Sequence, residues 1–193
     1  MIAVMSVALW LQDGFPIFFR QVRVGRNGKR FGLWKLRSMR TGSTGSLVTA
    51  GNDSRITPLG AFLRRYKLDE FPQLWNVLKG DMSLIGPRPE VPPYVEESNA
   101  TWQRILAHRP GITDFATLLF RDEERILALQ PDPEHYYREK ILPSKLALNI
   151  EYLDKRSFLS DVRLILLTIR YSFFPSTLDS GAIRKAVLSP PNQ

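Results

Sequence analysis

Two adjacent carboxylates, Asp69 and Glu70, stand directly before a segment that a proline and a glycine delimit. Pro72 is typical of the first turn of a helix and Gly80 of a helix end, so the sequence predicts a short helix with both carboxylates at its positive end. Ionised carboxylates near basic residues bind divalent cations or attack phosphorus as nucleophiles, and we therefore expect phosphoryl chemistry. The alternative is structural, with Asp69 as an N-cap and Glu70 as a partner of the helix dipole.

Residues 18–36 have the pattern of a β-hairpin. Two runs that contain apolar residues flank a short segment with Asn27-Gly28, a strong signal for a turn with positive φ. Alternation along the second strand places Lys35 and Arg37 on the same face. These two cations form either a solvated basic face or part of a substrate site.

Arg88 lies between two prolines, Pro87 and Pro89. The first fixes its own φ and the second disfavours helical geometry at Arg88, so the backbone is rigid here. A guanidinium is planar, always charged and suited to bidentate phosphate binding. Arg88 is therefore a candidate for clamping a diphosphate, the alternative being a turn arginine paired with Glu90.

Charge and composition narrow the class of protein. The 193 residues include 27 Lys+Arg against 19 Asp+Glu, a net charge of +8, so the surface should attract nucleic acid, anionic lipid or diphosphates. The absence of cysteine excludes disulfides, thiolate metal sites and a cysteine nucleophile. With only His108 and His135 present, a multi-histidine metal site or a serine triad has little to draw on.

Several segments have apolar patterns typical of helices. Residues 1–11 are apolar and uncharged, but they are about half the ~20 residues that span a bilayer. Residues 58–67 and 159–174 are amphipathic, and the apolar side of the second fits either core packing or a membrane interface. We expect residues 41–52 to form a mobile loop that covers the site when substrate binds. In the short helix that Pro72 and Gly80 delimit, three apolar side chains are predicted to pack in the core: Leu74, Trp75 and Leu78.

Five segments occur in one fixed order, and together they are more specific than any one of them: residues 19–28, 31–39, 68–80, 81–90 and 109–113. This string closely resembles the bacterial sugar transferase family, the monotopic phosphoglycosyl transferases. The resemblance extends from about residue 15 to residue 169. Many members have a glycine where this chain has Asp114, a change near the acceptor site or the sugar pocket.

The resemblance implies an enzyme that transfers a sugar-1-phosphate from a UDP-sugar to polyprenyl (undecaprenyl) phosphate and releases UMP. Such a reaction initiates the assembly of exopolysaccharide, O-antigen, capsule or glycoprotein glycans. Asp69 is the implied nucleophile, which forms a covalent aspartyl-phosphosugar intermediate. Glu70 completes the dyad, either as a metal ligand or in proton movement, and Mg²⁺ is the implied cofactor, with Asp69 and Glu70 as its candidate ligands. The candidate substrate-binding residues are Lys35, Arg37 and Arg88.

We expect an α+β fold, a mostly helical single domain with an N-terminal β-hairpin, associated as a monotopic protein with the cytoplasmic face of a bacterial inner membrane. Residues 1–14 would be the remnant of a hydrophobic membrane-associating segment, as an internal start site or a truncated chain would leave it. Residues 15–175 would form the catalytic domain and residues 176–193 a flexible tail. The expected partners are the two substrates and an anionic membrane surface, without nucleic acid; the oligomeric state stays open.

Two other classes of protein fit parts of the sequence. A catalytically silent assembly subunit at the membrane surface would explain the amphipathic segments. A basic nucleic-acid-binding module would explain the charge, but the sequence has no recognisable nucleic-acid motif and this reading leaves the acidic pair without a purpose.

Overall fold

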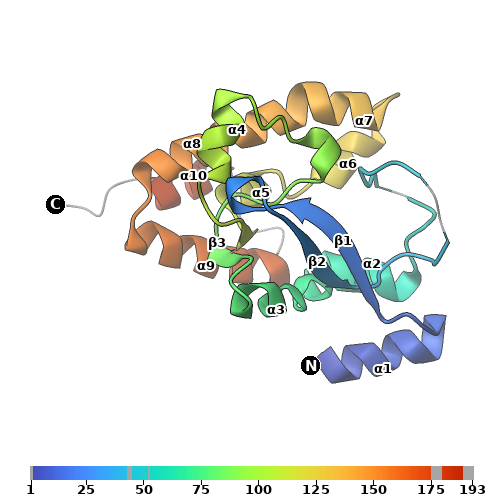
Figure 1. The fold of residues 1–193 in the computed structure, drawn as a ribbon. Coiled ribbons are helices and arrows are strands. Elements are labelled where there is room, and N and C mark those ends of the chain that lie inside the picture. Colours follow the sequence, from blue (N-terminus) through green and yellow to red (C-terminus); the bar gives the residue numbers. More distant parts are fainter. Residues whose placement is uncertain (1, 43–44, 52, 175–179, 189–193) are drawn as a thin grey trace.

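The computed structural model describes residues 2–42, 45–51, 53–174 and 180–188. Helices surround a long two-stranded hairpin that crosses the middle of the molecule (Figure 1). The first half of the chain forms, in order, α1 (Ile2–Asp13), β1 (Phe18–Val24), the 3₁₀ turn η1 (Arg26–Gly28), β2 (Arg30–Leu36), α2 (Pro58–Arg65), the 3₁₀ turn η2 (Leu68–Glu70), α3 (Gln73–Leu78), β3 (Ser83–Ile85) and the 3₁₀ turn η3 (Pro92–Tyr94).

The second half is almost wholly helical. Its elements are α4 (Ala100–Leu106), β4 (Gly111–Thr113), α5 (Phe115–Leu119), α6 (Glu123–Ala128), α7 (Pro133–Tyr136), the π-helical turn η4 (Tyr137–Ile141), α8 (Leu142–Lys155), α9 (Phe158–Phe173) and α10 (Ser180–Leu188). With two small sheets among many helices, the expected α+β class is confirmed.

The predicted hairpin is confirmed. Strands β1 and β2 pair antiparallel, with Phe18 opposite Leu36 and Val24 opposite Arg30. The turn contains Asn27 at φ 57° and Gly28 at φ 74°, as the Asn-Gly pair predicts.

Helix α1 lies below the hairpin in Figure 1. Its Met5 and Leu9 are buried against Leu36 of β2 and Leu63 of α2. At 12 residues it is about 18 Å long, against about 30 Å for the hydrocarbon core of a bilayer. Nowhere in the described ranges is a helix both long and apolar enough to cross a membrane.

The second sheet joins two of the family-like segments. Strands β3 and β4 pair in parallel, with Ser83 opposite Gly111 and Ile85 opposite Thr113. A Cβ on Gly111 would lie 2.2 Å from the backbone nitrogen of Gly86, so the two backbones approach this closely only because both residues are glycine. This contact places the Pro-Arg-Pro loop beside the start of β4.

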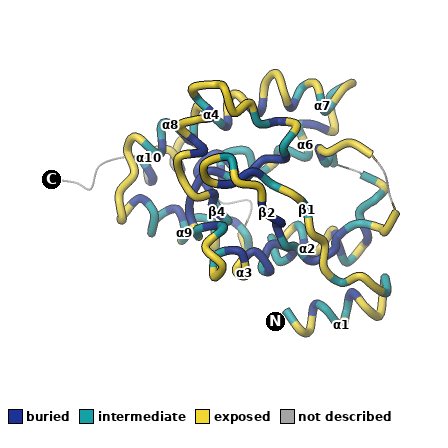
Figure 2. The backbone as a smooth tube through the Cα atoms, viewed as in Figure 1, coloured by how far each residue is buried: buried dark blue, intermediate teal, exposed yellow. Residues whose placement is uncertain are grey.

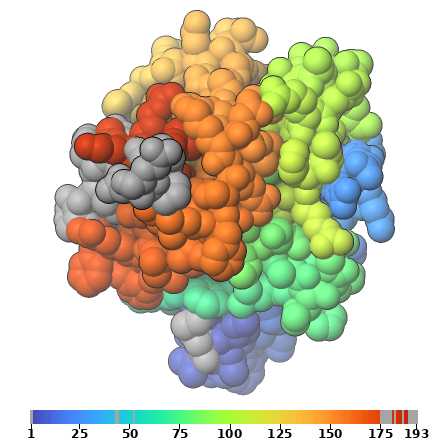
Figure 3. Space-filling model, turned by 90° about the vertical axis from the view of Figure 1, so that its left-hand side faces the viewer, coloured from blue at the N-terminus to red at the C-terminus, as the bar shows by residue number. Residues whose placement is uncertain are grey.

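Two hydrophobic clusters form most of the core. The larger cluster joins α4, α6 and α8 and is centred on Trp102, Ile105, Leu127, Tyr137 and Ile141. The second cluster lies under α9 and α10 and is centred on Phe115, Tyr152, Leu164, Ile183 and Val187. Figure 3 shows the C-terminal helices on one face of the molecule, with α1 at its lower edge.

The structure differs from the predicted flexible tail at residues 176–193. Residues 180–188 form α10, which buries Ile183 and Val187 against the second cluster. These two apolar residues, one helical turn apart, explain the docking. Residues 176–179 and 189–193 lie outside the described residues.

The prediction that α3 buries its apolar side chains is wrong. Leu74, Trp75 and Leu78 are 41%, 57% and 79% exposed, whereas Gln73 and Asn76 of the same helix are buried. The contrast between exposed and buried turns of α3 is visible along the tube in Figure 2. The helix turns its polar side inward because Asn76 has hydrogen-bond partners there, as described below.

Candidate active site

Four predicted side chains come from three separate parts of the fold. Lys35 is the penultimate residue of β2, Asp69 and Glu70 lie in η2, and Arg88 follows β3. The structure brings Lys35, Glu70 and Arg88 into direct contact, with Asp69 beside them.

Asn76 holds η2 and α3 against the hairpin. Its side-chain amide donates to the carbonyl of Gly32 at 2.8 Å, and its side-chain oxygen accepts from the backbone N–H of Trp34 at 3.1 Å. Both bonds satisfy the free edge of β2, much as a third strand would. No sequence signal indicated this role of Asn76 beyond its place in a family-like segment.

Glu70 is the centre of the cluster. Arg88 donates to both of its carboxylate oxygens, from Nη1 at 3.2 Å and from Nη2 at 2.5 Å, and Lys35 Nζ donates at 3.1 Å. The Glu70 residue is 7% exposed. The side chains of Lys35 and Arg88 are 18% and 19% exposed, so both cations keep N–H groups within reach of a ligand.

Asp69 is in a different environment from its neighbour. It is 3% exposed, and its Oδ1 is buried with no hydrogen-bond partner among the described residues. An unpaired buried carboxylate oxygen is costly and therefore uncommon, so this atom is the first candidate for contact with a substrate or a metal ion.

The pKa values of the two carboxyls shift in opposite directions. Burial raises the pKa of Asp69, and the charge of Glu70 raises it further, against the opposing charges of Lys35 and Lys67. Burial would also raise the pKa of Glu70, but the charges of Arg88 and Lys35 outweigh it and hold that pKa well below its usual range. Adjacent titratable groups with diverging pKa values are typical of catalytic pairs.

The loop that carries Arg88 is fixed from outside the cluster. Arg23 of β1 donates to the carbonyl of Pro89 at 3.1 Å and lies 3.6 Å from the carboxylate of Glu90. Glu90 also accepts a 2.6 Å hydrogen bond from the hydroxyl of Tyr137. The alternative pairing of Arg88 with Glu90 is therefore wrong, because Glu90 has other partners.

Arg37 does not join the contacts around Glu70. It follows β2, is 5% exposed, and donates from Nη2 to the carbonyl of Gly14 at 2.8 Å. Its Nε and Nη1 are buried without a hydrogen-bond partner in the part of the chain that is described. A role for Arg37 in substrate binding stays a prediction.

Asp114 lies close enough to the cluster to act on it. Its carboxylate caps α5 by accepting from the backbone N–H of Thr117 at 2.7 Å and from the Thr117 hydroxyl at 2.6 Å. Burial opposes charge on Arg88, but the charges of Glu70 and Asp114 together raise the pKa of Arg88.

The described parts of the predicted covering loop are anchored elsewhere. Val48 is buried in the larger core cluster, Ser46 bonds Glu134 at 3.0 Å, and the N–H of Gly51 donates to the carbonyl of Glu124 at 2.6 Å. Residues 43–44 and 52 lie outside the described residues. The contacts place residues 46–51 against α6 and α7, not over the acidic pair.

The acidic pair is enclosed and does not line the large surface hollow. That hollow, of about 1040 Å³, lies between α4 and α8, and its lining includes Tyr94, Trp102, Arg104, Arg138 and Leu146. None of the four clustered side chains lines it.

Comparison with known proteins places this chain in a family. The family model described as "Bacterial sugar transferase" matches residues 1–175. Among curated proteins, the chain is 35% identical over 186 residues to the galactosyl transferase CpsE of Streptococcus agalactiae, covering 88% of this chain and 37% of the relative.

Two further relatives are both named UDP-glucose:undecaprenyl-phosphate glucose-1-phosphate transferase. The protein of Xanthomonas campestris is 35% identical over 175 residues, covering 84% of this chain and 33% of the relative. The protein of Escherichia coli is 35% identical over 174 residues, covering 87% and 35%. The chain thus spans about a third of the length of these three relatives.

Proposed function

The chain belongs to the bacterial sugar transferase family, and on that premise we propose that it transfers a sugar-1-phosphate from a UDP-sugar to polyprenyl phosphate. The names of two relatives support both substrates, since each is called a UDP-glucose:undecaprenyl-phosphate transferase. The observation that carries the proposal is the pairing of a cation-bound Glu70 with an unpaired Asp69.

In the first step, a carboxylate oxygen of Asp69 attacks the phosphorus that bears the sugar. A bond forms between that oxygen and phosphorus, the bond from phosphorus to the bridging oxygen breaks, and UMP leaves with the electron pair. Arg88 and Lys35 support this step because their remaining N–H groups can hold the oxygens of the diphosphate.

In the second step, an oxygen of polyprenyl phosphate attacks the same phosphorus. The bond to Asp69 breaks, the carboxylate is restored, and a polyprenyl diphosphate-sugar is released. Because no proton must be removed from a phosphate oxygen that is already ionised, Glu70 needs no proton-accepting role. Its contacts favour a different one, which is to hold Lys35 and Arg88 in place beside Asp69.

The residues present fit Mg²⁺ through Asp69. Its buried Oδ1 lacks a partner within the described chain, whereas both oxygens of Glu70 already accept hydrogen bonds. No group of three or more acidic or histidine ligands occurs among the residues described, which suits an ion held by one or two carboxylates together with substrate phosphates. When bound, Mg²⁺ would neutralise charge on the diphosphate.

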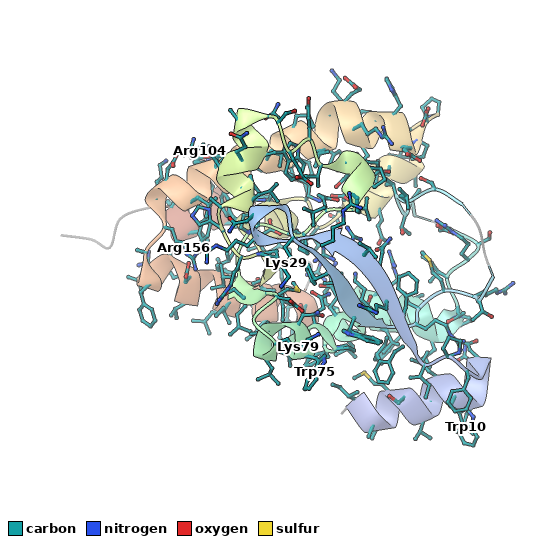
Figure 4. All side chains as sticks on the ribbon, viewed as in Figure 1. Trp10, Lys29, Trp75, Lys79, Arg104 and Arg156 are labelled. Carbon is teal, nitrogen blue, oxygen red and sulfur yellow. The ribbon has the colours of Figure 1, made fainter. Side chains whose placement is uncertain are left out.

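We place the protein on the cytoplasmic face of the bacterial inner membrane, where its lipid substrate is available. Helices α1, α3 and α9 lie in the lower part of the molecule in Figure 1, and Trp10 and Trp75 both project from that side in Figure 4. Such apolar and aromatic side chains are suited to the headgroup boundary. The exposed large apolar residues on these helices are Val4, Val7, Trp10, Leu11, Leu74, Trp75, Leu78, Phe158, Leu159, Leu166, Ile169 and Phe173.

The test is incubation with a panel of labelled UDP-sugars, polyprenyl phosphate and Mg²⁺. We expect UMP and a lipid-linked sugar diphosphate from at least one donor, and no UMP after chelation of Mg²⁺. Failure of every donor in the presence of lipid and metal would refute the proposed transferase activity. It would leave the assembly subunit or the nucleic-acid-binding module as the remaining interpretation.

A further inference from the structure

Lys67 has an unusual backbone conformation two residues before Asp69. Its φ of 57° and ψ of 22° lie in the left-handed region, which favours glycine and asparagine and is costly for a lysine. Its N–H donates to the carbonyl of Arg64 at 3.1 Å, and its carbonyl accepts from the N–H of Glu70 at 3.3 Å. Lys67 is thus the point at which the chain leaves α2 and turns both carboxylates inward.

The turn explains the left-handed backbone conformation of residue 67 but not why a lysine occupies the position. Glycine or asparagine would adopt the same φ and ψ with less strain, so a lysine at this position points to a use for its side chain. Lys67 is partly exposed, and its side chain makes no hydrogen bond or ion pair within the described ranges. Its charge nevertheless acts on both Asp69 and Glu70.

Lys67 also contributes to the charge balance of the cluster. The charges of Lys35 and Arg88 balance those of Asp69 and Glu70, so these four groups alone are neutral. The other nearby cations have carboxylate partners of their own: Arg64 pairs with Glu124, and Arg23 with Glu90. The negative charge of Asp114 also acts on Arg88, and Lys67 supplies the positive charge that offsets it. Because the Lys67 side chain has no ion-pair partner among the described residues, its ammonium is available to an entering anion.

We propose that Lys67 is a substrate-binding residue whose ammonium holds a phosphate oxygen next to Asp69. This assignment rests on the proposed function, in which phosphate enters twice, first as the diphosphate of the UDP-sugar and then as the phosphate of the polyprenyl acceptor. A lysine acts on either group as a point charge. The shared ligand chemistry is therefore a phosphate group.

Three variants separate the charge from the backbone. Lys67→Asn and Lys67→Gly remove the ammonium and tolerate the left-handed conformation. Lys67→Arg keeps the positive charge and, like the parent lysine, adopts that conformation at a cost. Lys140→Asn, at an exposed lysine of η4, is the control for a loss of one positive charge. We expect Lys67→Asn and Lys67→Gly to unfold at or above the temperature of the parent protein.

Binding of inorganic phosphate and pyrophosphate, measured by calorimetry, tests the proposal without turnover. The loss of a hydrogen bond to a charged group predicts about 10- to 100-fold weaker binding of at least one probe to Lys67→Asn. Lys67→Arg and Lys140→Asn should stay within about threefold of the parent protein. Unchanged affinity of Lys67→Asn for both probes overturns the proposal, and so does an equal loss in Lys67→Arg and Lys67→Asn.

Steady-state kinetics identify which substrate supplies the phosphate. A raised KM for the UDP-sugar in Lys67→Asn assigns the residue to the donor, and a raised KM for polyprenyl phosphate assigns it to the acceptor. If the parent protein releases no UMP while the probe affinities differ as expected, the transferase proposal fails and Lys67 stands as an anion site.

Discussion

Arg88 donates hydrogen bonds to both carboxylate oxygens of Glu70, while Oδ1 of the adjacent Asp69 is buried without a partner among the described residues. Removal of one member of a buried ion pair leaves the other charge uncompensated, which is strongly destabilising. Removal of an unpaired buried charge has no such cost. The two neighbouring carboxylates should therefore respond in opposite ways to neutral substitutions.

Asp69→Asn should abolish turnover without loss of stability. The amide has nearly the shape of the carboxylate but cannot form the aspartyl-phosphosugar bond. We expect no UMP release and no labelled adduct, and a free energy of unfolding in urea equal to or above that of the parent protein. Retained turnover would exclude Asp69 as the nucleophile.

Glu70→Gln should destabilise the fold, because it leaves Lys35 and Arg88 near each other without their anion. We expect a loss of about 3–5 kcal/mol in the free energy of unfolding. Glu151→Gln is the matched control: Glu151 also accepts from two cations, Lys155 and Arg184, but at the surface. Its loss should be at most about 1 kcal/mol, and equal losses in the two variants would contradict the role given to Glu70.

Arg88→Lys keeps the charge but loses the planar fork. We expect a cost of about 2–4 kcal/mol in transition-state stabilisation, measured from kcat/KM for UMP release. The control is Arg156→Lys, because Arg156 makes a similar two-pronged contact with both carboxylate oxygens of Asp161, at the left of the molecule in Figure 4. Activity of Arg88→Lys within twofold of the parent protein would make Arg88 a structural residue.

Ionisation of Asp69 should lower the stability of the parent protein as the pH rises. Burial raises the pKa of this carboxyl in the folded state, so the folded state favours the protonated form. The resulting stabilisation is complete below the unfolded pKa of about 4 and is lost as the pH rises through the folded value. Asp69→Asn lacks this term, so its free energy of unfolding relative to the parent protein should be higher at neutral pH than near pH 4. Urea denaturation at both values measures the difference, and a pH-independent difference would contradict the raised pKa.

Glu70 contributes with the opposite sign. Its folded pKa lies well below the ordinary value, so its stabilisation is present above the unfolded pKa and is lost as the pH falls through the folded one. Comparison of Glu70→Gln with the parent protein should therefore show the larger loss at neutral pH.

The hairpin turn and the rigid backbone at Arg88 could be predicted because their signals are local. Asn27-Gly28 specifies a turn whatever surrounds it, and the two prolines beside Arg88 restrict its backbone directly. The contact between Lys35 and Glu70 has no local signal of this kind, and only the order of the family-like segments implied it.

The features that were missed depend on contacts between distant segments. The apolar spacing of α3 predicts a buried face, but the hydrogen bonds of Asn76 to the edge of β2 turn that face outward. The left-handed conformation of Lys67 follows from the junction of α2 with η2, and no residue preference indicates it. Tertiary hydrogen bonds of this kind override local propensity.

The exposed apolar side of α3 leads to the last prediction, which concerns the membrane. If α3 docks at the headgroup boundary, Leu78→Ser should weaken the binding of the protein to anionic liposomes. Leu129→Ser is a closely matched control, because Leu129 is 78% exposed and Leu78 is 79% exposed, but Leu129 follows α6 on the upper side of the molecule in Figure 1. Burial of a leucine side chain contributes about 1.5–3 kcal/mol, so we expect the partition coefficient of Leu78→Ser to fall by about tenfold or more and that of Leu129→Ser to stay unchanged.

Cosedimentation with anionic liposomes at low and high salt measures the apolar and the electrostatic contributions to this binding. The net charge of +8 should make part of the binding salt-sensitive. Equal effects of the two substitutions, or a parent protein that stays in the supernatant at low salt, would refute docking through α3.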